Sequence, residues 1–379
     1  MDALVTDVQH RAVVAGLRAL GRSGLRVLAM APRRNAAGLW SRYADRRALA
    51  PDPALNPTGF VDAALAIAER HRVHVVYPGT EAAIAAILPH WARFGNSSVL
   101  PYAGAESLRA IRDKRLLPGA AHSVGLRTPV TFMECTGAEL MSQPVPIPCI
   151  VKPADPATQP GGTHAISSRE DLEHLLHSRG IAPERPLVVQ EWVRGPIVSV
   201  ELVLSRDGEL VQRFQQIASR TWPTAAGSIS LATSVPADQQ LVDRGAEMLR
   251  QVGYWGLAQL DFVQGVGEPV LIDVNPRFYS CLPLALACGV NLPAAWHEVA
   301  LGRSQAAPSD YRTGVTFRWL EGDLIAALRG EHARLRGAGR RRSVGAMWAR
   351  DDPRASAVLG IGAIAVRAGR VLQIPRDRE

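Results

Sequence analysis

Only two lysines occur in this chain, Lys114 and Lys152, although the formal net charge is +8 and arginine supplies the other side-chain cations. A lysine ammonium is a compact point charge on a flexible stem, suited to reaching between phosphate oxygens in a narrow cleft, whereas arginine is a planar fork. We therefore interpret both lysines as members of a phosphate-binding site. The alternative is that the two lysines are surface residues retained by chance. For either lysine alone, chance and a site role are equally good explanations, but the surrounding residues of both disfavour chance.

The composition predicts a soluble globular protein. A chain of 379 residues should form two or three domains, because one hydrophobic core rarely grows past roughly 250 to 300 residues. Its 47% hydrophobic and 21% charged residues rule against wholesale disorder. The four cysteines lack metal-binding or disulfide-framework spacing, and no signal peptide or membrane-spanning stretch is recognisable, so we expect a cytoplasmic location.

The elements that must position the lysines begin with an alternation of strands and helices over residues 1–105. This alternation predicts an open parallel sheet. We expect strands at 3–6, 26–30 and 73–77 and helices at 11–20 and 60–70. No GxGxxG follows the first strand, which disfavours dinucleotide binding. The segment Gly79-Thr80-Glu81 fits an ordinary turn with a threonine cap better than a ligand-facing loop.

From about residue 106 the pattern changes to a mixed, largely antiparallel unit. A helix at 168–178 is marked by Ser168 and Asp171, which are spaced as a capping box. The other expected elements are a helix at 239–252 and strands at 145–153, 187–190, 198–204, 210–215, 257–263 and 270–274. From about residue 304 the composition becomes rich in arginine.

These residues resemble the ATP-grasp superfamily, specifically its carboxylate-amine ligase branch with the carbamoyl phosphate synthetase-like domains. The resemblance covers about residues 1–305, and its most specific element is Asp261 together with Asp273-Val274-Asn275-Pro276-Arg277. It implies an α/β and α+β fold: a Rossmann-like N-terminal domain (1–105), an ATP-grasp domain of two α+β subdomains that clamp ATP (106–303), and a basic C-terminal extension (304–379). The mobile lid subdomain would span about 115–190.

The resemblance implies that Asp261, Asp273 and Asn275 bind Mg²⁺ or Mn²⁺. Two carboxylates and an amide oxygen suit a hard cation that prefers oxygen ligands. Alternation along a strand puts Asp273, Asn275 and Arg277 on one face. The alternative, a polar strand end that runs into a turn, is disfavoured by the two lysines and Asp261.

The phosphates of ATP would be bound by Lys114, Lys152 and the loop that follows Lys152. In this loop the chain departs from the family, because Pro156 and Pro160 stand where relatives carry glycines. The remaining donors are the amides of Gly161, Gly162 and Thr163 and the Thr163 hydroxyl. The departure puts normal phosphate clamping by the loop in doubt.

The adenine would be recognised at Gln190-Glu191-Trp192-Val193. By resemblance, the backbone carbonyl of Glu191 and the N–H of Val193 face the base, and Ile272 offers an apolar floor. The family usually adds a glutamate for the ribose a few residues later. Glu201 is the nearest candidate, and it is equally well explained as a solvated strand residue.

The implied reaction is ATP-dependent ligation of a small carboxylic acid to an amine through an acyl phosphate. Arg277 and Lys152 are the expected catalytic residues, because they would neutralise charge on the transferred phosphoryl group. Arg220 is the candidate for a substrate carboxylate, slightly favoured over a surface ion pair. We expect a small carboxylate and a small amine as partners, and no nucleic acid. A homodimer is compatible with the sequence.

Two other functions are kept open: an ATP-grasp ligase with a thiol or other acceptor, and a non-catalytic protein that binds nucleotides or nucleic acid. The pI of about 9.8 and Arg340-Arg341-Arg342 favour the latter, but the basic tail lacks interleaved aromatic residues. After residue 304, the spacing of apolar residues over 319–328 predicts a helix. The apolar run at 358–366 is interpreted as a packed strand rather than a membrane or partner contact.

Overall fold

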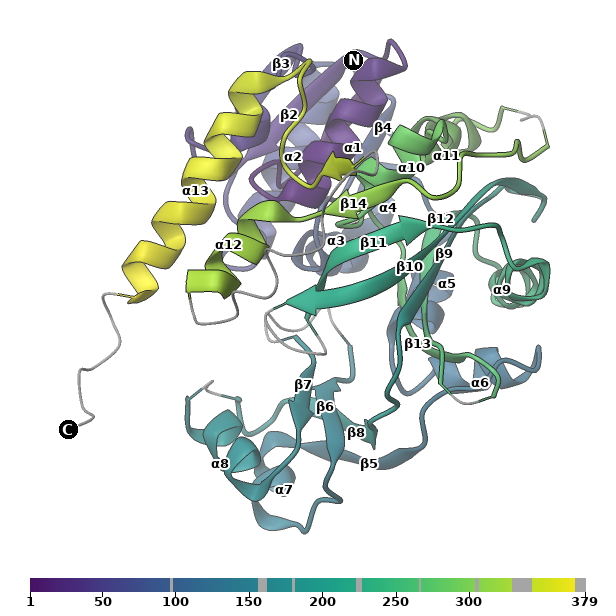
Figure 1. The fold of residues 1–379 in the computed structure, drawn as a ribbon. Helices are drawn as coiled ribbons and strands as arrows, with labels where there is room; N and C mark the ends of the chain where they lie inside the picture. The colour runs from purple at the N-terminus through teal and green to yellow at the C-terminus, as the bar shows by residue number, and fades with distance from the viewer. Residues whose placement is uncertain are drawn as a thin grey trace.

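The structure, a computed structural model, describes residues 1–95, 98–155, 162–178, 181–222, 227–265, 267–303, 307–328 and 343–371. The N-terminal unit has a parallel four-stranded sheet in the order β3-β2-β1-β4 (Figure 1). Its strands are β1 (Ala3–Val5), β2 (Val27–Ala31), β3 (Arg46–Leu49) and β4 (Val75–Tyr77). Its helices are α1 (Arg11–Arg22), η1 (Ala37–Trp40), α2 (Pro57–Arg70), α3 (Glu81–Ile87), η2 (Leu88–His90) and α4 (Trp91–Phe94). The predicted strands and helices of this unit are confirmed, whereas β3, which carries exposed arginines, was not predicted.

The turn after β4 leads into α3 and is hydrogen-bonded to the residue that follows β1. The Thr80 hydroxyl caps α3 by accepting a 3.1 Å bond from the backbone N–H of Ala83. The backbone N–H of Gly79 donates to the hydroxyl of Thr6, which follows β1. A Cβ at Gly79 would lie 2.4 Å from the Thr6 carbonyl oxygen, so only glycine fits here. The start of α3 is therefore fixed against the end of β1.

A second, antiparallel sheet has the order β5-β8-β6-β7. It lies with α7 and α8 at the bottom of the view in Figure 1 and is reached through α5 (Ala105–Arg112) and α6 (Leu117–His122). Its elements are β5 (Thr131–Thr136), α7 (Gly137–Ser142), β6 (Cys149–Pro153), β7 (His164–Ile166), α8 (Arg169–Ser178) and β8 (Pro186–Glu191). Nine buried residues of these elements form a hydrophobic core of their own, separate from the main core. The predicted capping box of α8 is confirmed, since Ser168 and Asp171 exchange hydrogen bonds of 3.1 and 3.2 Å.

The third sheet has seven strands in the order β13-β12-β9-β10-β11-β14-β15. Its first five strands in this order are β13 (Val270–Asn275), β12 (Gly256–Val263), β9 (Ile197–Leu204), β10 (Leu210–Trp222) and β11 (Ser228–Ser234), all antiparallel to their neighbours. Three helices pack against this sheet: α9 (Gln239–Gln251), α10 (Leu282–Cys288) and α11 (Leu292–Ala300). The prediction of a mixed, largely antiparallel unit is confirmed.

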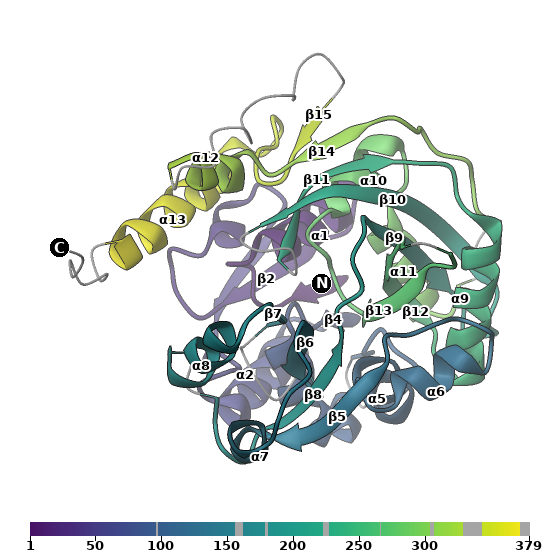
Figure 2. The ribbon, with the colours of Figure 1, turned by 60° about the horizontal axis from the view of Figure 1, so that its bottom comes forward.

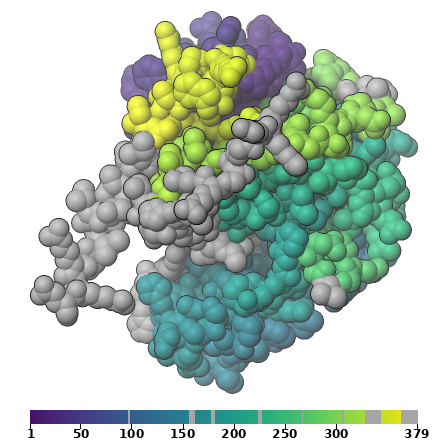
Figure 3. Space-filling view, viewed as in Figure 1, coloured from purple at the N-terminus to yellow at the C-terminus, as the bar shows by residue number. Residues whose placement is uncertain are grey.

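The residues after 307 complete this sheet and return to the N-terminal unit. They form β14 (Thr316–Arg318), α12 (Leu320–Leu328), β15 (Ser343–Gly345) and α13 (Pro353–Val371). Figure 2 shows α12 and α13 side by side along one edge of the molecule, and in Figure 3 the C-terminal residues cover part of the N-terminal ones. The helix over 319–328 is confirmed, but the strand predicted at 358–366 is wrong because these residues lie within α13. Pro353 at the first helical position and the many alanines favour a helix, and contacts with η1 stabilise it.

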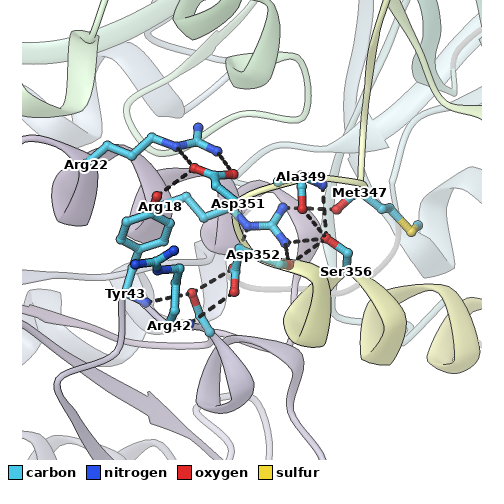
Figure 4. Close-up of polar contacts among 10 residues, drawn as sticks. Arg18, Arg22, Arg42, Tyr43, Met347, Ala349, Asp351, Asp352 and Ser356 are labelled. Carbon is cyan, nitrogen blue, oxygen red and sulfur yellow. Dashed lines mark hydrogen bonds and ion pairs between the residues drawn. The ribbon is translucent and has the colours of Figure 1, made fainter.

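Two adjacent aspartates attach the C-terminal segment to the N-terminal unit (Figure 4). Asp352 is buried and accepts bonds from Arg18 Nε at 2.8 Å and Ser41 Oγ at 2.7 Å. Asp351 accepts from Arg22 Nη2 at 2.7 Å and from the Tyr43 hydroxyl at 2.6 Å. The segment is thus held by charged hydrogen bonds as well as by apolar packing. In the described ranges, no helix combines the length and apolar character needed to cross a bilayer.

Candidate functional site

A cavity of about 620 Å³ is lined by residues of both antiparallel sheets. The lining includes eleven of the residues predicted for the site: Lys114, Lys152, Gly162, Thr163, Glu191, Val193, Asp261, Ile272, Asp273, Asn275 and Arg277. Gly161 lies outside the described residues. Residues far apart in the sequence therefore meet in one place, as a shared ligand site requires.

The two lysines meet at neighbouring residues of β13. The Lys114 ammonium is paired with the Asp273 carboxylate, and the Lys152 ammonium donates a 3.0 Å bond to the backbone carbonyl of Ile272. Both side chains are buried, at 6% and 8% exposure. Burial lowers the pKa of Lys152 to about 7, and the positive charge of Lys114 adds to this effect. An anion that entered the cavity would relieve this repulsion between two cations.

Asp261 and Asp273 are directly opposite each other on β12 and β13. The Ser199 hydroxyl donates a 2.6 Å bond to Asp261 Oδ1, and the Asn275 amide nitrogen lies 3.2 Å from Asp261 Oδ2 and 3.4 Å from Asp273 Oδ2. Burial raises the pKa of Asp261 to about 7 against the Ser199 hydrogen bond, and the charge of Asp273 adds to the rise. Two close, partly buried carboxylates offer the oxygen donors and the negative charge that suit Mg²⁺.

The third member of this donor set is an amide rather than an acid. Within the ranges that the structure describes, no group of three or more His, Cys, Asp or Glu side chains could hold a metal ion. Asn275 Oδ1 accepts a 3.0 Å bond from Arg277 Nη2. A cation bound by Asp261, Asp273 and Asn275 would therefore share the amide oxygen with Arg277 or displace its hydrogen bond.

Another part of the cavity wall is formed where β8 ends. Glu191 and Val193 line it, as does Trp192, whose ring lies 4.2 Å from the Arg194 guanidinium carbon. The backbone N–H of Glu191 donates to the carbonyl of Val130 at 2.8 Å, which fixes the direction of the strand. Ile272 lines the same cavity and supplies an apolar surface.

Two predicted site residues lie elsewhere among the described residues. Glu201 is fully buried within the seven-stranded sheet, where its Oε1 accepts bonds from Gln216 and Gln259 at 2.8 and 2.9 Å. Burial raises its pKa well above the usual range. Arg220 donates a 2.6 Å bond to the buried carboxylate of Asp323 in α12. The structure thus places Glu201 in the interior and gives Arg220 an ion-pair partner from the C-terminal segment.

Sequence reasoning missed other residues at or beside the cavity, among them Glu81, Ser199 and Gln259. Glu81 accepts a 2.7 Å bond from Arg277 Nε. The sequence feature that could have identified Glu81 is its position in Gly79-Thr80-Glu81, directly after a strand. The interpretation as a capped turn is correct for Thr80, but it overlooked the next side chain.

Comparison with known proteins shows similarity to ATP-grasp proteins over part of the chain. Residues 183–323 match the family described as "ATP-grasp in the biosynthetic pathway with Ter operon". Over 170 residues the chain is 25% identical to an acetyl-CoA carboxylase of Dictyostelium discoideum, covering 42% of this chain and 7% of that protein. Over 140 residues it is 21% identical to the carbamoyl phosphate synthase large chain of Caldanaerobacter subterraneus subsp. tengcongensis, covering 36% of this chain and 13% of that one. The chain thus spans only a small part of these relatives.

Solved structures show the same fold. The biotin carboxylase domain of the Hydrogenobacter thermophilus 2-oxoglutarate carboxylase, solved with MgADP, ADP and bicarbonate, matches with a TM-score of 0.63 at 14% identity, covering 83% of this chain and 72% of that one. The biotin carboxylase of Campylobacter jejuni, solved with β-γ-ATP, matches with a TM-score of 0.62 at 15% identity, covering 83% and 74%. Residues 183–323 therefore match an ATP-grasp family model, and most of the chain shares its fold with the biotin carboxylase structures.

Proposed function

We propose that the protein is an ATP-dependent ligase that activates a small carboxylic acid as an acyl phosphate and couples it to an amine. One observation supports this most: the two lysines of the chain converge with two opposed carboxylates in a single cavity. Cations for phosphate and oxygens for a divalent metal, side by side, match what ATP and Mg²⁺ require.

Each part of the cavity has a proposed role in binding ATP. Lys114, Lys152, Gly162 and Thr163 bind the phosphates, together with Gly161. The backbone of Glu191 and Val193 reads the adenine edge over Ile272. Glu201 lies too deep for a direct ribose contact without rearrangement, so its proposed role is to brace Gln259, which lines the cavity.

Asp261, Asp273 and Asn275 would hold Mg²⁺, which supplies charge neutralisation for the phosphates when bound. The substrate carboxylate attacks the γ-phosphorus, ADP leaves, and the amine then attacks the acyl carbon and releases phosphate. Arg277 and Lys152 stabilise the negative charge that develops on the phosphoryl oxygens and on the tetrahedral oxyanion. Arg220 is proposed to pair with a substrate carboxylate, which would have to compete with the Asp323 carboxylate for the guanidinium.

The proposed division of the chain has three parts, of which the last contributes β14 and β15 to the seven-stranded sheet of the second. Residues 1–105 form a Rossmann-like domain, 106–303 the ATP-grasp domain with a lid at about 115–190, and 304–379 an extension. The separate core of the β5-β8-β6-β7 sheet supports a lid that moves as a unit. We propose a cytoplasmic protein with small-molecule substrates.

The test measures ADP and phosphate release with MgATP and pools of carboxylic acids and amines, with Lys152→Ala as the inactive control. Hydroxylamine added without an amine should trap the acyl phosphate as a hydroxamate. Release that requires a thiol would instead favour a thioester-forming ligase. ATP binding without any acid-dependent release would indicate a non-catalytic nucleotide-binding protein and would contradict the proposal.

A further inference from the structure

The side chain of Arg277, two residues after β13, is held by a residue of the N-terminal unit. Its Nε donates a 2.7 Å hydrogen bond to Oε1 of Glu81, which is 196 residues away in the sequence. Glu81 is the first residue of α3, directly after the turn that leaves β4. The other two nitrogens of the guanidinium contact the backbone oxygen of Phe278 at 3.2 Å and Asn275 Oδ1 at 3.0 Å. The N-terminal unit thus supplies the anionic partner of Arg277.

The second oxygen of the same carboxylate holds another arginine. Glu81 Oε2 accepts from Arg112 Nε at 2.9 Å and from Arg112 Nη2 at 2.7 Å. Arg112 is 1% exposed and its Nη2 also lies 3.4 Å from Asp155, three residues after Lys152. Burial opposes ionisation of Glu81, but the charges of Arg112 and Arg277 outweigh it and lower its pKa to about 2. Glu81 is therefore a charged group shared between two guanidinium groups.

The position of Glu81 is fixed by the backbone around it. The Thr80 cap holds the first turn of α3, and Gly79 bonds to Thr6 where a larger residue would not fit. The carboxylate that faces Arg277 therefore belongs to a rigid part of the fold.

Without Glu81, the Arg277 guanidinium could pair with other carboxylates. Asp273 and Asp261 both interact electrostatically with Arg277, and an arginine fork pairs readily with a carboxylate. If Arg277 turned toward them, it would occupy the oxygens proposed to bind the metal and would leave the phosphate end of the cavity. Glu81 prevents this rotation of Arg277 because it accepts a hydrogen bond from Arg277 Nε, while Arg277 Nη2 stays bonded to Asn275.

We propose that Glu81 is a positioning residue for phosphoryl transfer, which holds the Arg277 guanidinium at the phosphate end of the cavity and links it through Arg112 to Asp155. The inference rests on the proposed function, because it assigns Glu81 to the step in which Arg277 stabilises the transferred group. Glu81 itself touches no reacting atom.

Glu81→Asp keeps the charge and withdraws it by one methylene group, and Glu81→Gln keeps the shape and removes the charge. Both should lower kcat for acid-dependent phosphate release about 10- to 100-fold, as small misplacements of catalytic groups do. The affinity for MgATP, measured by calorimetry, should stay within about threefold, because the lysines and the adenine contacts are untouched. Asp352→Asn is the matched control: it also alters a buried carboxylate that holds an arginine, and its kcat should stay native.

A double variant separates positioning from general damage to the fold. If Glu81 acts through Arg277, then Glu81→Asp/Arg277→Ala should be no slower than Arg277→Ala alone. Multiplied losses in the double variant, or native kcat in a folded Glu81→Asp protein, would overturn the inference.

A measurement that needs no turnover keeps this test independent of the proposed function. The ¹⁵Nε–¹Hε NMR signal of Arg277 should be visible and slowly exchanging in the native protein and in Asp352→Asn, and should shift or broaden in Glu81→Gln. If the native protein shows no acid-dependent release, the proposed function fails, while this signal still decides whether Glu81 holds Arg277. An unchanged signal in Glu81→Gln would reject the inference.

Discussion

The Lys152 ammonium donates a 3.0 Å hydrogen bond to the backbone carbonyl of Ile272, 120 residues further along the chain. This bond joins β6 of the small sheet to β13 of the large sheet. The lysine thus lies at the junction of two bodies with separate hydrophobic cores. A ligand in this cavity would contact both bodies, because residues of both line it.

Replacing Lys152 by Ala should weaken MgATP binding about 10- to 100-fold, because a charged hydrogen-bond donor to phosphate contributes roughly 1.5–3 kcal/mol. Lys152→Arg should restore little of this, since the planar fork does not fit a site shaped for an ammonium. Calorimetry measures both, and circular dichroism checks the fold. Native affinity in the alanine variant would remove Lys152 from the phosphate site.

Asp273→Asn should abolish Mg²⁺-dependent turnover, because it removes one of the two opposed carboxylates and the partner of Lys114. Some nucleotide binding should remain, since the proposed adenine-reading backbone at Glu191 and Val193 lies at the end of β8 and just after it. Asp351→Asn, far from the cavity, serves as a control for the loss of an arginine-bound carboxylate. Metal titration of ADP release measures the effect, and a native rate would mean that the metal site is elsewhere.

Stability should fall in mild acid because of His297. This side chain is buried, its Nδ1 lies 3.0 Å from the Tyr77 hydroxyl, and burial lowers its pKa to about 4. The unfolded chain binds a proton near pH 6.5 and the folded chain only near pH 4, so stability declines as the pH falls between these values. The loss at pH 4 should be on the order of 3 kcal/mol.

His297→Asn should remove most of this slope, whatever its effect at neutral pH. His74→Asn is the control, because His74 is 57% exposed. Urea titrations from pH 4 to 8 measure the free energy of unfolding. An unchanged slope in His297→Asn would show that other groups cause the acid sensitivity.

Asp352→Ala should lower the free energy of unfolding by about 3 kcal/mol, because it leaves the buried Arg18 without its carboxylate partner. MgATP affinity should be unchanged, since Asp352 does not line the cavity described above. Asp310→Ala, whose carboxylate is fully exposed beside Arg213, should cost little. Equal effects of the two substitutions would contradict the structural role of Asp352.

The sequence supported the elements whose side chains alternate or recur with a clear period. The strands around Asp261 and Asp273 and the helix around Leu241 were predicted to within a few residues, because one face of each is apolar. The helix α13 was misread as a strand, since an apolar run of β-branched residues and alanines fits both periods. The exposed arginines of β3 hid a strand that is defined by its neighbours rather than by its own sequence.

The site was predictable where one side chain type was rare or a short motif was specific, as for Lys114, Lys152 and Asp273. It was not predictable where the contact depends on the packing of distant units. No local pattern shows that Glu201 turns into the sheet toward Gln216, or that Glu81 reaches Arg277. The first contact follows from the register of the β9–β10 hairpin, and the second from the packing of α3 against the residues after β13.

The attachment of Asp351 and Asp352 to α1 and η1 has a consequence for synthesis. The partners of Arg18 and Arg22 are synthesised 334 and 329 residues after them, so the N-terminal unit emerges with this surface unfinished. A nascent chain that stops before residue 351 exposes Arg18 and the apolar residues around it to solvent. Asp351 and Asp352 therefore complete a surface that Arg18 and Arg22 began.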